Sequence, residues 1–311
     1  MLIETITYEG FDYTRRGTLV KHKLILAAML CFKINVRKNL IKQVEVNALI
    51  KKSVSLEPPS QPESLRVFIP ENSWAMCKGL EENVEFFKNF MNNLENETIQ
   101  WKRWYGEERP EAAELPKSYK DISPFHRLFI LRALRPDRLS NALSQYVSDS
   151  LGVDYVEAPA FDPFKMVSEL TTKTAGFFVL FPGVDPTPDV EKVGATYGKA
   201  MADRTLVNIS MGQGQEAIAV KALHEAAKKG NWIMIQNTHL MAEWMKEFEM
   251  NLEIAMEEPH EDFRCFITSE PPPLPMMEIC PESILQNSVK VADEAPSDLK
   301  ANMRRAMNRF D

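Results

Sequence analysis

The second half of the sequence predicts an α/β domain with a parallel sheet in a three-layer sandwich, and the first half predicts a mainly α-helical region. The α/β prediction rests on short apolar runs that alternate with helical patterns. The runs are FFVLF (177–181), TLVNIS (205–210), WIMIQN (232–237) and FRCFITS (263–269). Apolar rather than alternating runs are typical of parallel strands buried on both faces. Helical patterns follow the first three runs at about 188–201, 214–229 and 240–256.

The helical prediction for the first half rests on apolar residues spaced three and four apart. Residues 15–54 are basic and apolar, with few helix breakers. From residue 80 to residue 105 an amphipathic pattern returns. Residues 123–151 predict one long helix interrupted by Pro136, which cannot donate a helical hydrogen bond. Two polar, proline-bearing segments separate these stretches: 56–64 and 106–116.

Composition limits the classes of function. The chain has 311 residues, 44% of them hydrophobic, which is enough for one large domain or two smaller ones. Its formal net charge is −7 and no basic stripe stands out, so no nucleic-acid partner is expected. The apolar run at 24–32 is shorter than the roughly 20 residues that span a bilayer, so no membrane association is expected. The cysteines and histidines are scattered, so no metal site is predicted.

The turn after the first predicted strand has the layout of a phosphate-binding loop but lacks its chemistry. A working loop reads G-x-x-x-x-G-K-[ST], whereas PGVDPTPD has Gly183 as its one glycine and no lysine. Asp185 would repel a phosphate by about 3 kcal/mol at ~5 Å and an effective dielectric of ~20. A helix N-terminus offers an anion only about 0.3–1 kcal/mol. Repulsion is the larger effect, so the turn is predicted to be degenerate unless Lys192 folds back over it.

Two further strand ends complete the expected pocket. The turn SMGQGQEA contains Gly212, and a glycine that shapes a tight turn is the favoured interpretation over one that binds an anion. WIMIQN has the layout of the Mg²⁺-binding strand of an ATPase, but Gln236 and Asn237 stand where carboxylates are needed. Neutral amides are poor ligands for Mg²⁺ and accept no proton from water at neutral pH. We therefore predict no catalytic, cofactor-binding or metal-ligating residue, and a degenerate pocket at Gly183, Asp185, Gly212, Gln236 and Asn237.

Two weaker signals are interpreted without a ligand. The stretch GATYGKA (194–200) imitates the phosphate loop, but three residues separate its glycines instead of four, and it is predicted to lie in the middle of a helix. Thr268 and Ser269 end the fourth run, where a sensor of the γ-phosphate could lie. We expect them to be ordinary strand-end hydroxyls.

Arg132, Arg135 and Arg138 recur at helical spacing in the segment LRALRPDRLSNAL. The plainer interpretation is a solvated basic face. The alternative is a docking edge for an acidic neighbour, because arginine side chains suit interfaces. We take the three as interface candidates.

Seven segments, in order along the chain, together resemble the heavy chain of dynein, the microtubule motor. The segments are RRGTLVKHKLILAAMLCFKI, RALRPDRL, LFPGVDPTPDV, ISMGQGQEAIAVKAL, GNWIMIQNTHLMAEWM, HEDFRCFITSEP and SILQNSVKVADEAPSDLKANM. The PGVDP turn together with GQGQE and IQN is more similar to axonemal outer-arm chains than to cytoplasmic ones. The sequence departs from the commoner serine-proline-glycine motif at Phe181, which replaces the serine.

The resemblance implies a ring of six AAA+ modules in one polypeptide, of which this chain is a part. Residues 121–295 would be the AAA+ (P-loop-like) large subdomain of the sixth module. Residues 1–120 would be the end of the fifth module or the stretch leading into the sixth, and residues 296–311 would begin the lid. ATP and Mg²⁺ are expected in other modules of the parent motor and not in this fragment.

The implied partners are the neighbouring AAA+ modules of the same chain. Intermediate chains, light chains and the microtubule would be contacted by other regions of the motor. The implied location is the cytoplasm and cytoskeleton, in the axoneme of a cilium or flagellum.

The expected function is that of a non-catalytic structural module, which relays conformational change within the ATP-driven, minus-end-directed motor ring. The full-length parent would be an ATPase, and this fragment is expected to be inactive. The alternative is an independent P-loop-like enzyme with an unorthodox nucleotide site around Gly183, Gly212, Gln236 and Asn237.

Overall fold

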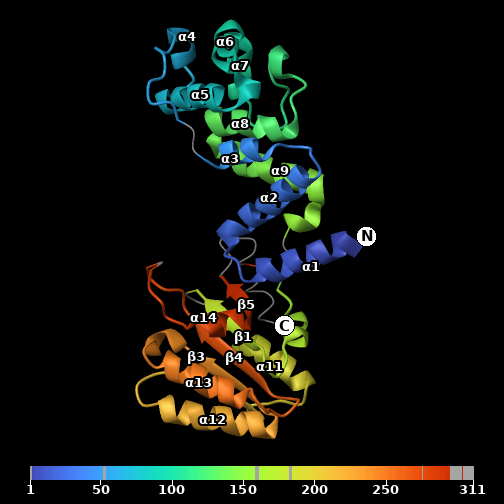
Figure 1. The fold of residues 1–311 in the computed structure, drawn as a ribbon, viewed down its shortest axis with the longest axis vertical. Helices are drawn as coiled ribbons and strands as arrows, with labels where there is room; N and C mark the ends of the chain where they lie inside the picture. Colours follow the sequence, from blue (N-terminus) through green and yellow to red (C-terminus); the bar gives the residue numbers. More distant parts are fainter. Residues whose placement is uncertain are drawn as a thin grey trace. The chain divides into compact units, whose positions relative to one another are not determined.

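The structure, a computed structural model, describes residues 2–51, 54–157, 161–181, 184–274, 276–294 and 303. The chain forms two compact units, which we call the helical unit (21–159) and the sheet unit (1–20 and 160–311). Figure 1 shows the elements of both. The predicted α/β class with a mainly helical region before it is confirmed. Except for residue 303, the predicted lid at 296–311 lies outside the described residues.

The sheet unit is built on five parallel strands in the order β2-β3-β4-β1-β5. Four strands coincide with the predicted apolar runs, and most of their residues are buried, as strands covered on both faces require. The fifth, β5, was not predicted because SVKVAD alternates like an edge strand. The strands are β1 (Ala175–Leu180), β2 (Leu206–Ser210), β3 (Trp232–Gln236), β4 (Arg264–Ser269) and β5 (Ser288–Asp293).

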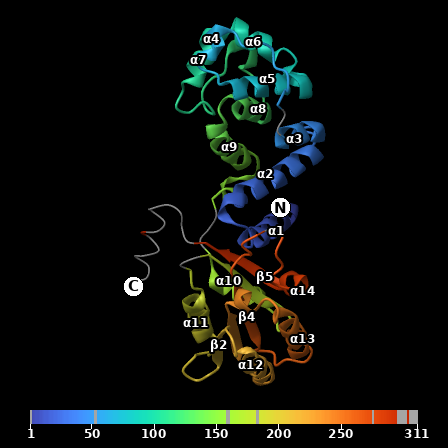
Figure 2. The same ribbon diagram turned by 90° about the vertical axis from the view of Figure 1, so that its left-hand side faces the viewer.

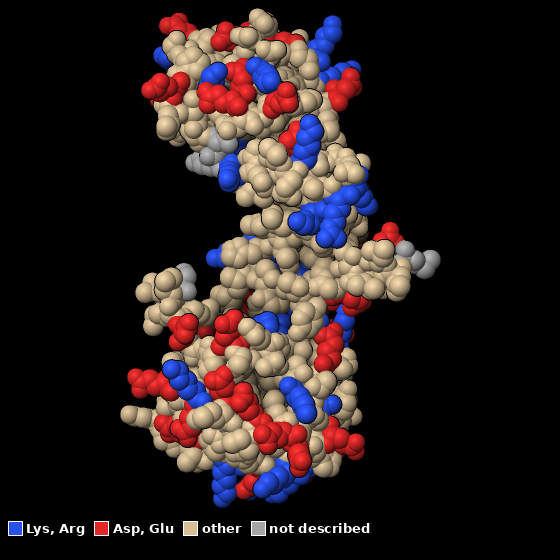
Figure 3. Space-filling model, viewed as in Figure 1, with Lys and Arg blue, Asp and Glu red and all other residues tan. Residues whose placement is uncertain are grey.

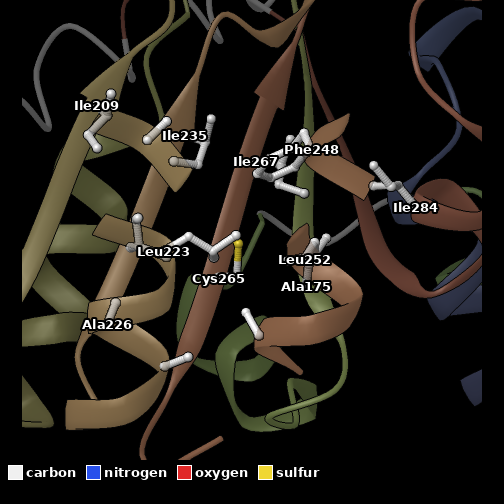
Figure 4. Close-up of a cluster of buried hydrophobic side chains, with 14 of the residues drawn as sticks. Ala175, Ile209, Leu223, Ala226, Ile235, Phe248, Leu252, Cys265, Ile267 and Ile284 are labelled. Carbon is white, nitrogen blue, oxygen red and sulfur yellow. The ribbon is translucent and has the colours of Figure 1, made fainter. Parts of the chain in front are cut away.

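Helices cover both faces of this sheet, which makes the predicted three-layer sandwich (Figure 2). On one face α12, α13 and α14 pack over side chains such as Ile235, Cys265 and Ile267 (Figure 4). On the other face α10 and α11 pack over Phe178, Met234 and their neighbours. The helical elements are α1 (Leu2–Arg16), α10 (Pro163–Glu169), α11 (Thr187–Thr196), α12 (Glu216–Lys229), the 3-10 helix η5 (Thr238–Met241), α13 (Met245–Ala255) and α14 (Glu282–Gln286).

Two helix ends differ from the predictions. The stretch 194–200 is not in the middle of a helix, because α11 ends at Thr196 and Gly198 adopts a left-handed φ of 68°. The helix predicted from about residue 240 begins with the 3-10 turn η5, and α13 starts only at Met245. Glycine tolerates the left-handed conformation that ends a helix, which explains the first difference.

Within the sheet unit, ion pairs join helix α1 to α10. Asp12 accepts hydrogen bonds from Arg15 (2.5 Å) and from Lys165 of α10 (2.9 Å). Arg16 pairs with Glu169, at the other end of α10, over 2.6 Å. Burial by itself raises the pKa of Asp12, but the hydrogen bonds from Lys165 and Arg15 outweigh it, so the pKa lies below its usual value.

The helical unit contains the other helices of the described chain. The predicted helix over 15–54 is broken, because α2 ends at Arg37 and a turn with Asn39 at φ 57° precedes α3. The amphipathic stretch 80–105 is likewise divided into short helices. The elements are α2 (Val20–Arg37), α3 (Gln43–Ile50), α4 (Glu63–Arg66), α5 (Glu71–Asn83), η1 (Glu85–Phe87), α6 (Phe90–Asn96), α7 (Thr98–Tyr105), η2 (Lys117–Tyr119), α8 (Pro124–Leu134), η3 (Pro136–Arg138), α9 (Leu139–Leu151) and η4 (Val153–Tyr155).

An aromatic cluster fills this unit and explains why such short helices hold together. Phe90 meets Trp101 edge to face at 5.6 Å between ring centroids, and Trp101 meets Trp104 in the same way at 5.7 Å. All three side chains are almost completely buried.

Pro136 interrupts the helix predicted over 123–151, as expected, between α8 and α9. Within the described ranges, no helix is both long and apolar enough to cross a bilayer.

Replacing Gly230 with alanine is expected to destabilise the chain by about 2–4 kcal/mol. Gly230 ends α12 at a φ of 70°, where a β-carbon would also collide with the His260 ring. The same replacement at exposed Gly10, where nothing lies within 4 Å of the new carbon, should be neutral or stabilise α1 by up to about 1 kcal/mol. Urea unfolding followed by circular dichroism measures both, and equal losses would contradict the interpretation.

Replacing Asp12 with asparagine should lower the free energy of unfolding by about 1–3 kcal/mol at neutral pH, because it removes a charged hydrogen-bond acceptor from the buried Arg15 and the half-buried Lys165. Since the folded pKa of Asp12 is lowered, its contribution is present above the unfolded pKa of about 3.9 and is lost as pH falls through the folded value. The difference between the two proteins should therefore shrink below about pH 4. In the exposed Glu85–Lys88 pair, Glu85→Gln should change stability by less than about 0.5 kcal/mol at any pH.

Candidate functional site

The predicted pocket positions lie at one edge of the sheet, because the carboxyl ends of all the parallel strands meet there. Gly183 lies outside the described residues. Asp185 follows β1, Gly212 follows β2, and Gln236 and Asn237 end β3 and begin the loop after it. Asp185 and Gln236 belong to one hydrogen-bond network, and Asn237 belongs to another.

The turn after β1 uses its carboxylate to start a helix. Asp185 Oδ1 accepts hydrogen bonds from the Thr187 backbone N–H (3.0 Å) and from the Thr187 hydroxyl (2.6 Å). This arrangement satisfies a free amide of the first turn of α11, which is the usual work of an aspartate before a helix. The carboxylate is thus committed to the local fold rather than held free for a ligand.

Gln236 closes the network from the sheet. Its Nε2 donates to Thr187 Oγ1 over 2.6 Å and lies 3.8 Å from the sulfur of Met234. Both Gln236 and Thr187 are half-buried. The hydroxyl therefore donates to Asp185 and accepts from Gln236, which joins the turn after β1 to the end of β3 without any other molecule. The sequence interpretation missed Thr187 as a site residue, although its hydroxyl at the start of a predicted helix was a visible signal.

Asn237 points into a second network, between β2, β3 and β4. It has a left-handed φ of 57°, which asparagine adopts more readily than most residues. Its Nδ2 donates to Ser210 Oγ (2.9 Å), and its backbone N–H donates to Thr268 Oγ1 (3.0 Å). The Thr238 hydroxyl donates to the Thr268 carbonyl (3.0 Å). Gln236 and Asn237 thus do not face one common point, as a pair of metal ligands would.

The remaining hydroxyls and the histidine of this edge serve the loops. Ser269 donates to the carbonyl of Glu270 (3.0 Å), and the Glu270 N–H donates to His239 Nδ1 (3.1 Å). The interpretation of Thr268 and Ser269 as strand-end hydroxyls agrees with these bonds. His239 is part of the loop packing, with 17% of its side chain exposed.

Gly212 and Gly214 shape the turn after β2. The Gln215 N–H donates to the Gly212 carbonyl (3.1 Å), which closes a tight turn before α12. Gly214 has a φ of 85° and so needs to be glycine, whereas Gly212 has no such requirement. Whether Gly212 has any role toward an anion stays a prediction.

The electrostatics of this edge do not favour a nucleotide. Asp185 contributes a negative charge beside the helix start, and Lys192 is exposed with no hydrogen bond or ion pair to a described residue. Lys192 therefore makes no bond to the described part of the turn. Across the described ranges, no group of three or more His, Cys, Asp or Glu side chains could hold a metal ion.

The interface candidate Arg132 bonds inside the helical unit. Its guanidinium donates to the carbonyls of Lys51 (3.1 Å) and Ile50 (3.3 Å), at the end of α3. These are carbonyls that a helix leaves without intrahelical partners, so Arg132 caps α3 from α8.

Arg135 and Arg138 secure the loop between α7 and α8. Arg135 donates to the Tyr105 carbonyl (2.5 Å) and pairs with Asp137 (2.8 Å). Arg138 forms an ion pair with Glu111, and its hydrogen bonds lower the pKa of that carboxyl. The three arginines do not form a solvated basic face, because each is half-buried and bonded to its own acceptor. A further role at an interface stays a prediction.

Comparison with known proteins agrees with the fold. Residues 158–292 match the family described as "Dynein heavy chain region D6 P-loop domain". The chain is 39% identical over 310 residues to the "Dynein alpha chain, flagellar outer arm" of Chlamydomonas reinhardtii. It is 38% identical over 309 residues to the human "Dynein axonemal heavy chain 9" and 34% identical over 310 residues to the "Dynein beta chain, ciliary" of Heliocidaris crassispina.

These alignments cover 99%, 99% and 100% of this chain and 7% of each relative, so the chain spans a small part of the length of the proteins it matches. The five parallel strands, apart from the last residue of β5, and the helices α10 to α14 lie within the matched family region, whereas α1 lies outside it. Residues 158–292 are therefore a dynein heavy chain D6 P-loop domain, and the whole chain is homologous to one segment of the axonemal and flagellar outer-arm dynein heavy chains.

Proposed function

We propose that this chain is a non-catalytic structural AAA+ module, the sixth of the ring, in an axonemal dynein heavy chain. Its work is to relay conformational change within an ATP-driven, minus-end-directed microtubule motor. One observation carries the proposal: the amide of Gln236 bonds directly to the hydroxyl of Thr187, between the two elements where a P-loop enzyme holds its metal and nucleotide.

The geometry of that bond is incompatible with P-loop chemistry. In P-loop NTPases the Mg²⁺ ion is held by a Ser or Thr hydroxyl of the loop and by the Walker-B Asp. Magnesium needs oxygen ligands at about 2.0–2.1 Å in an octahedral arrangement. Here Thr187 Oγ1 and Gln236 Nε2 are 2.6 Å apart, and the group turned toward the hydroxyl is an N–H donor, which a cation avoids.

The same edge is well built for transmitting displacement. Hydrogen bonds of 2.6–3.0 Å join α11 to β3, β3 to β2 and β3 to β4. These bonds need no ligand, so the edge stays tied together whatever nucleotide is bound elsewhere. A rigidly tied sheet moves as one body, which is the common mode by which domains pass on conformational change.

The proposal assigns ATP and Mg²⁺ to other modules of the parent motor and none to this fragment. It assigns residues 121–295 to the large subdomain, 1–120 to the region before it and 296–311 to the start of the lid. The partners proposed are neighbouring modules of the same polypeptide, with Arg132, Arg135 and Arg138 as candidate contacts. Intermediate and light chains and the microtubule are assigned to other regions, and the location proposed is the axoneme, because the relatives carry axonemal, ciliary and flagellar names.

Replacing Thr187 with valine should destabilise the chain by about 1–2 kcal/mol, because Asp185 and Gln236 both lose their partner at a half-buried site. The matched control is Thr7→Val on α1, where the hydroxyl bonds only to the exposed Ile3 carbonyl and the loss should stay below about 0.5 kcal/mol. Urea denaturation measures both. A Thr187→Val protein as stable as the wild type would show that the bridge does not hold this edge.

Titration of the chain with Mg²⁺-ATP should give no saturable binding below about 1 mM, read by isothermal calorimetry at neutral pH. Restoring a loop lysine directly before Thr187, with Pro186→Lys, should still give no release of phosphate, because Gln236 and Asn237 supply no carboxylate. Micromolar binding with turnover by the unaltered chain would establish the alternative of an independent P-loop-like enzyme. Turnover after the loop change alone would contradict the metal argument and leave the family assignment untouched.

A further inference from the structure

Helix α2 lies in a stretch of unusual charge. Between Asp12 and Glu45 the sequence contains eight Lys or Arg residues and no Asp or Glu, although the chain as a whole carries −7. The expectation that no basic stripe stands out is therefore wrong for this stretch. Figure 3 shows blue side chains gathered over the part of the chain that Figure 1 labels α2.

The packing of α2 fixes which side faces outward. Its inner face consists of buried residues, among them Ala27, Cys31 and Phe32. Phe32 meets Phe125 of α8 edge to face at 5.7 Å. Asn35, also buried, donates to the hydroxyl of Tyr146 in α9 over 2.8 Å, so both the rotation and the position of α2 are set within the helical unit.

The opposite face carries an exposed row at steps of three and four residues, which we call the outer stripe: His22, Ile25, Met29, Lys33 and Arg37. Ile25 and Met29 are 54% and 46% exposed and lie one helical turn apart in this row. Lys33 and Arg37 form no ion pair with a described residue. The stripe thus combines an apolar centre with unneutralised positive charge at one end.

We propose that the outer stripe of α2 is a docking surface for an acidic amphipathic helix of a partner protein or module. Burial of Ile25 and Met29 would remove apolar surface from water, and partner carboxylates would neutralise Lys33 and Arg37. Lys33 and Arg37 are one helical turn apart, about 6 Å along the axis, so carboxylates spaced four residues apart on a partner helix match them.

Two other anionic partners fit less well. A helix that binds a membrane surface buries a broad apolar face, but the broad face of α2 is already used against α8 and α9. Nucleic acid would leave Ile25 and Met29 without apolar contacts, and the net charge of −7 opposes it at long range. The inference is independent of the nucleotide edge, so a failure of the proposed function does not decide it.

The probe is a blocked, alanine-based helical peptide with two leucines four residues apart and glutamates at four-residue spacing beside them. A matched peptide carries lysine at each glutamate position. Fluorescence anisotropy with the full 311-residue chain should show saturable binding of the acidic peptide, weaker at higher salt, and no binding of the lysine peptide. Lys33→Glu with Arg37→Glu should weaken binding about tenfold or more, since each reversed exposed charge costs a few-fold in affinity.

The control for charge is Lys221→Glu with Lys246→Glu, which makes the same change at exposed positions of α12 and α13 and should leave binding unchanged. Met29→Ala should weaken binding without altering its salt dependence. If the reversed variant fails to fold by circular dichroism, Lys33→Gln with Arg37→Gln replaces it. Equal binding of both peptides, no saturable binding, or stripe-dependent binding to phosphatidylserine vesicles or to a second copy in place of the peptide would each overturn the proposal.

Discussion

The arrangement of the sheet unit depends on one constraint, which is that its strands are parallel and buried on both faces. Parallel strands direct their carboxyl ends to one edge, so the four loops after β1, β2, β3 and β4 must share that edge. At this edge Gln236 is half-buried and Thr268 and Ser269 are buried, and an unbonded buried donor or acceptor costs about 1–3 kcal/mol. Polar groups at this edge therefore need a ligand or one another. In the described residues they bond to one another, as Gln236 and Thr187 do over 2.6 Å.

The two aspartates Asp12 and Asp185 differ in their burial and in the charge of their hydrogen-bond donors. Asp12 is buried, but the cations Arg15 and Lys165 stabilise its ionised form. The bond to Lys165 therefore holds α1 against α10. Asp185 is exposed, and its carboxylate accepts hydrogen bonds from the amide and hydroxyl of Thr187, which are neutral donors. Neutral donors do not compensate the negative charge of a carboxylate, and that charge repels a phosphate at the start of the helix. Position and partner, more than residue type, decide what each aspartate does.

Sequence patterns predicted the parts of the fold that depend on local periodicity. Apolar runs located four strands because a strand buried on both faces leaves little ambiguity, whereas β5 alternates at a sheet edge and was missed. At the site, the absence of a loop lysine and of strand carboxylates was readable directly. The bond between Thr187 and Gln236 was not, because it joins residues 49 positions apart and depends on how α11 sits beside β3. The acceptors of Arg132, Arg135 and Arg138 were not predicted either, because they lie on segments distant in the sequence.

Amides at the end of β3 are the residues that a ligand-free edge of this kind requires. A glutamate at position 236 would place a second carboxylate near Asp185 and would offer only acceptors to a hydroxyl whose proton already goes to Asp185. An apolar residue there would leave the Thr187 oxygen without its donor. Glutamine supplies the N–H that the hydroxyl accepts, and Asn237 supplies one for Ser210 while tolerating a left-handed backbone. Neutral hydrogen bonds thereby join the loops of this P-loop domain to one another, which suits the relay role proposed for it.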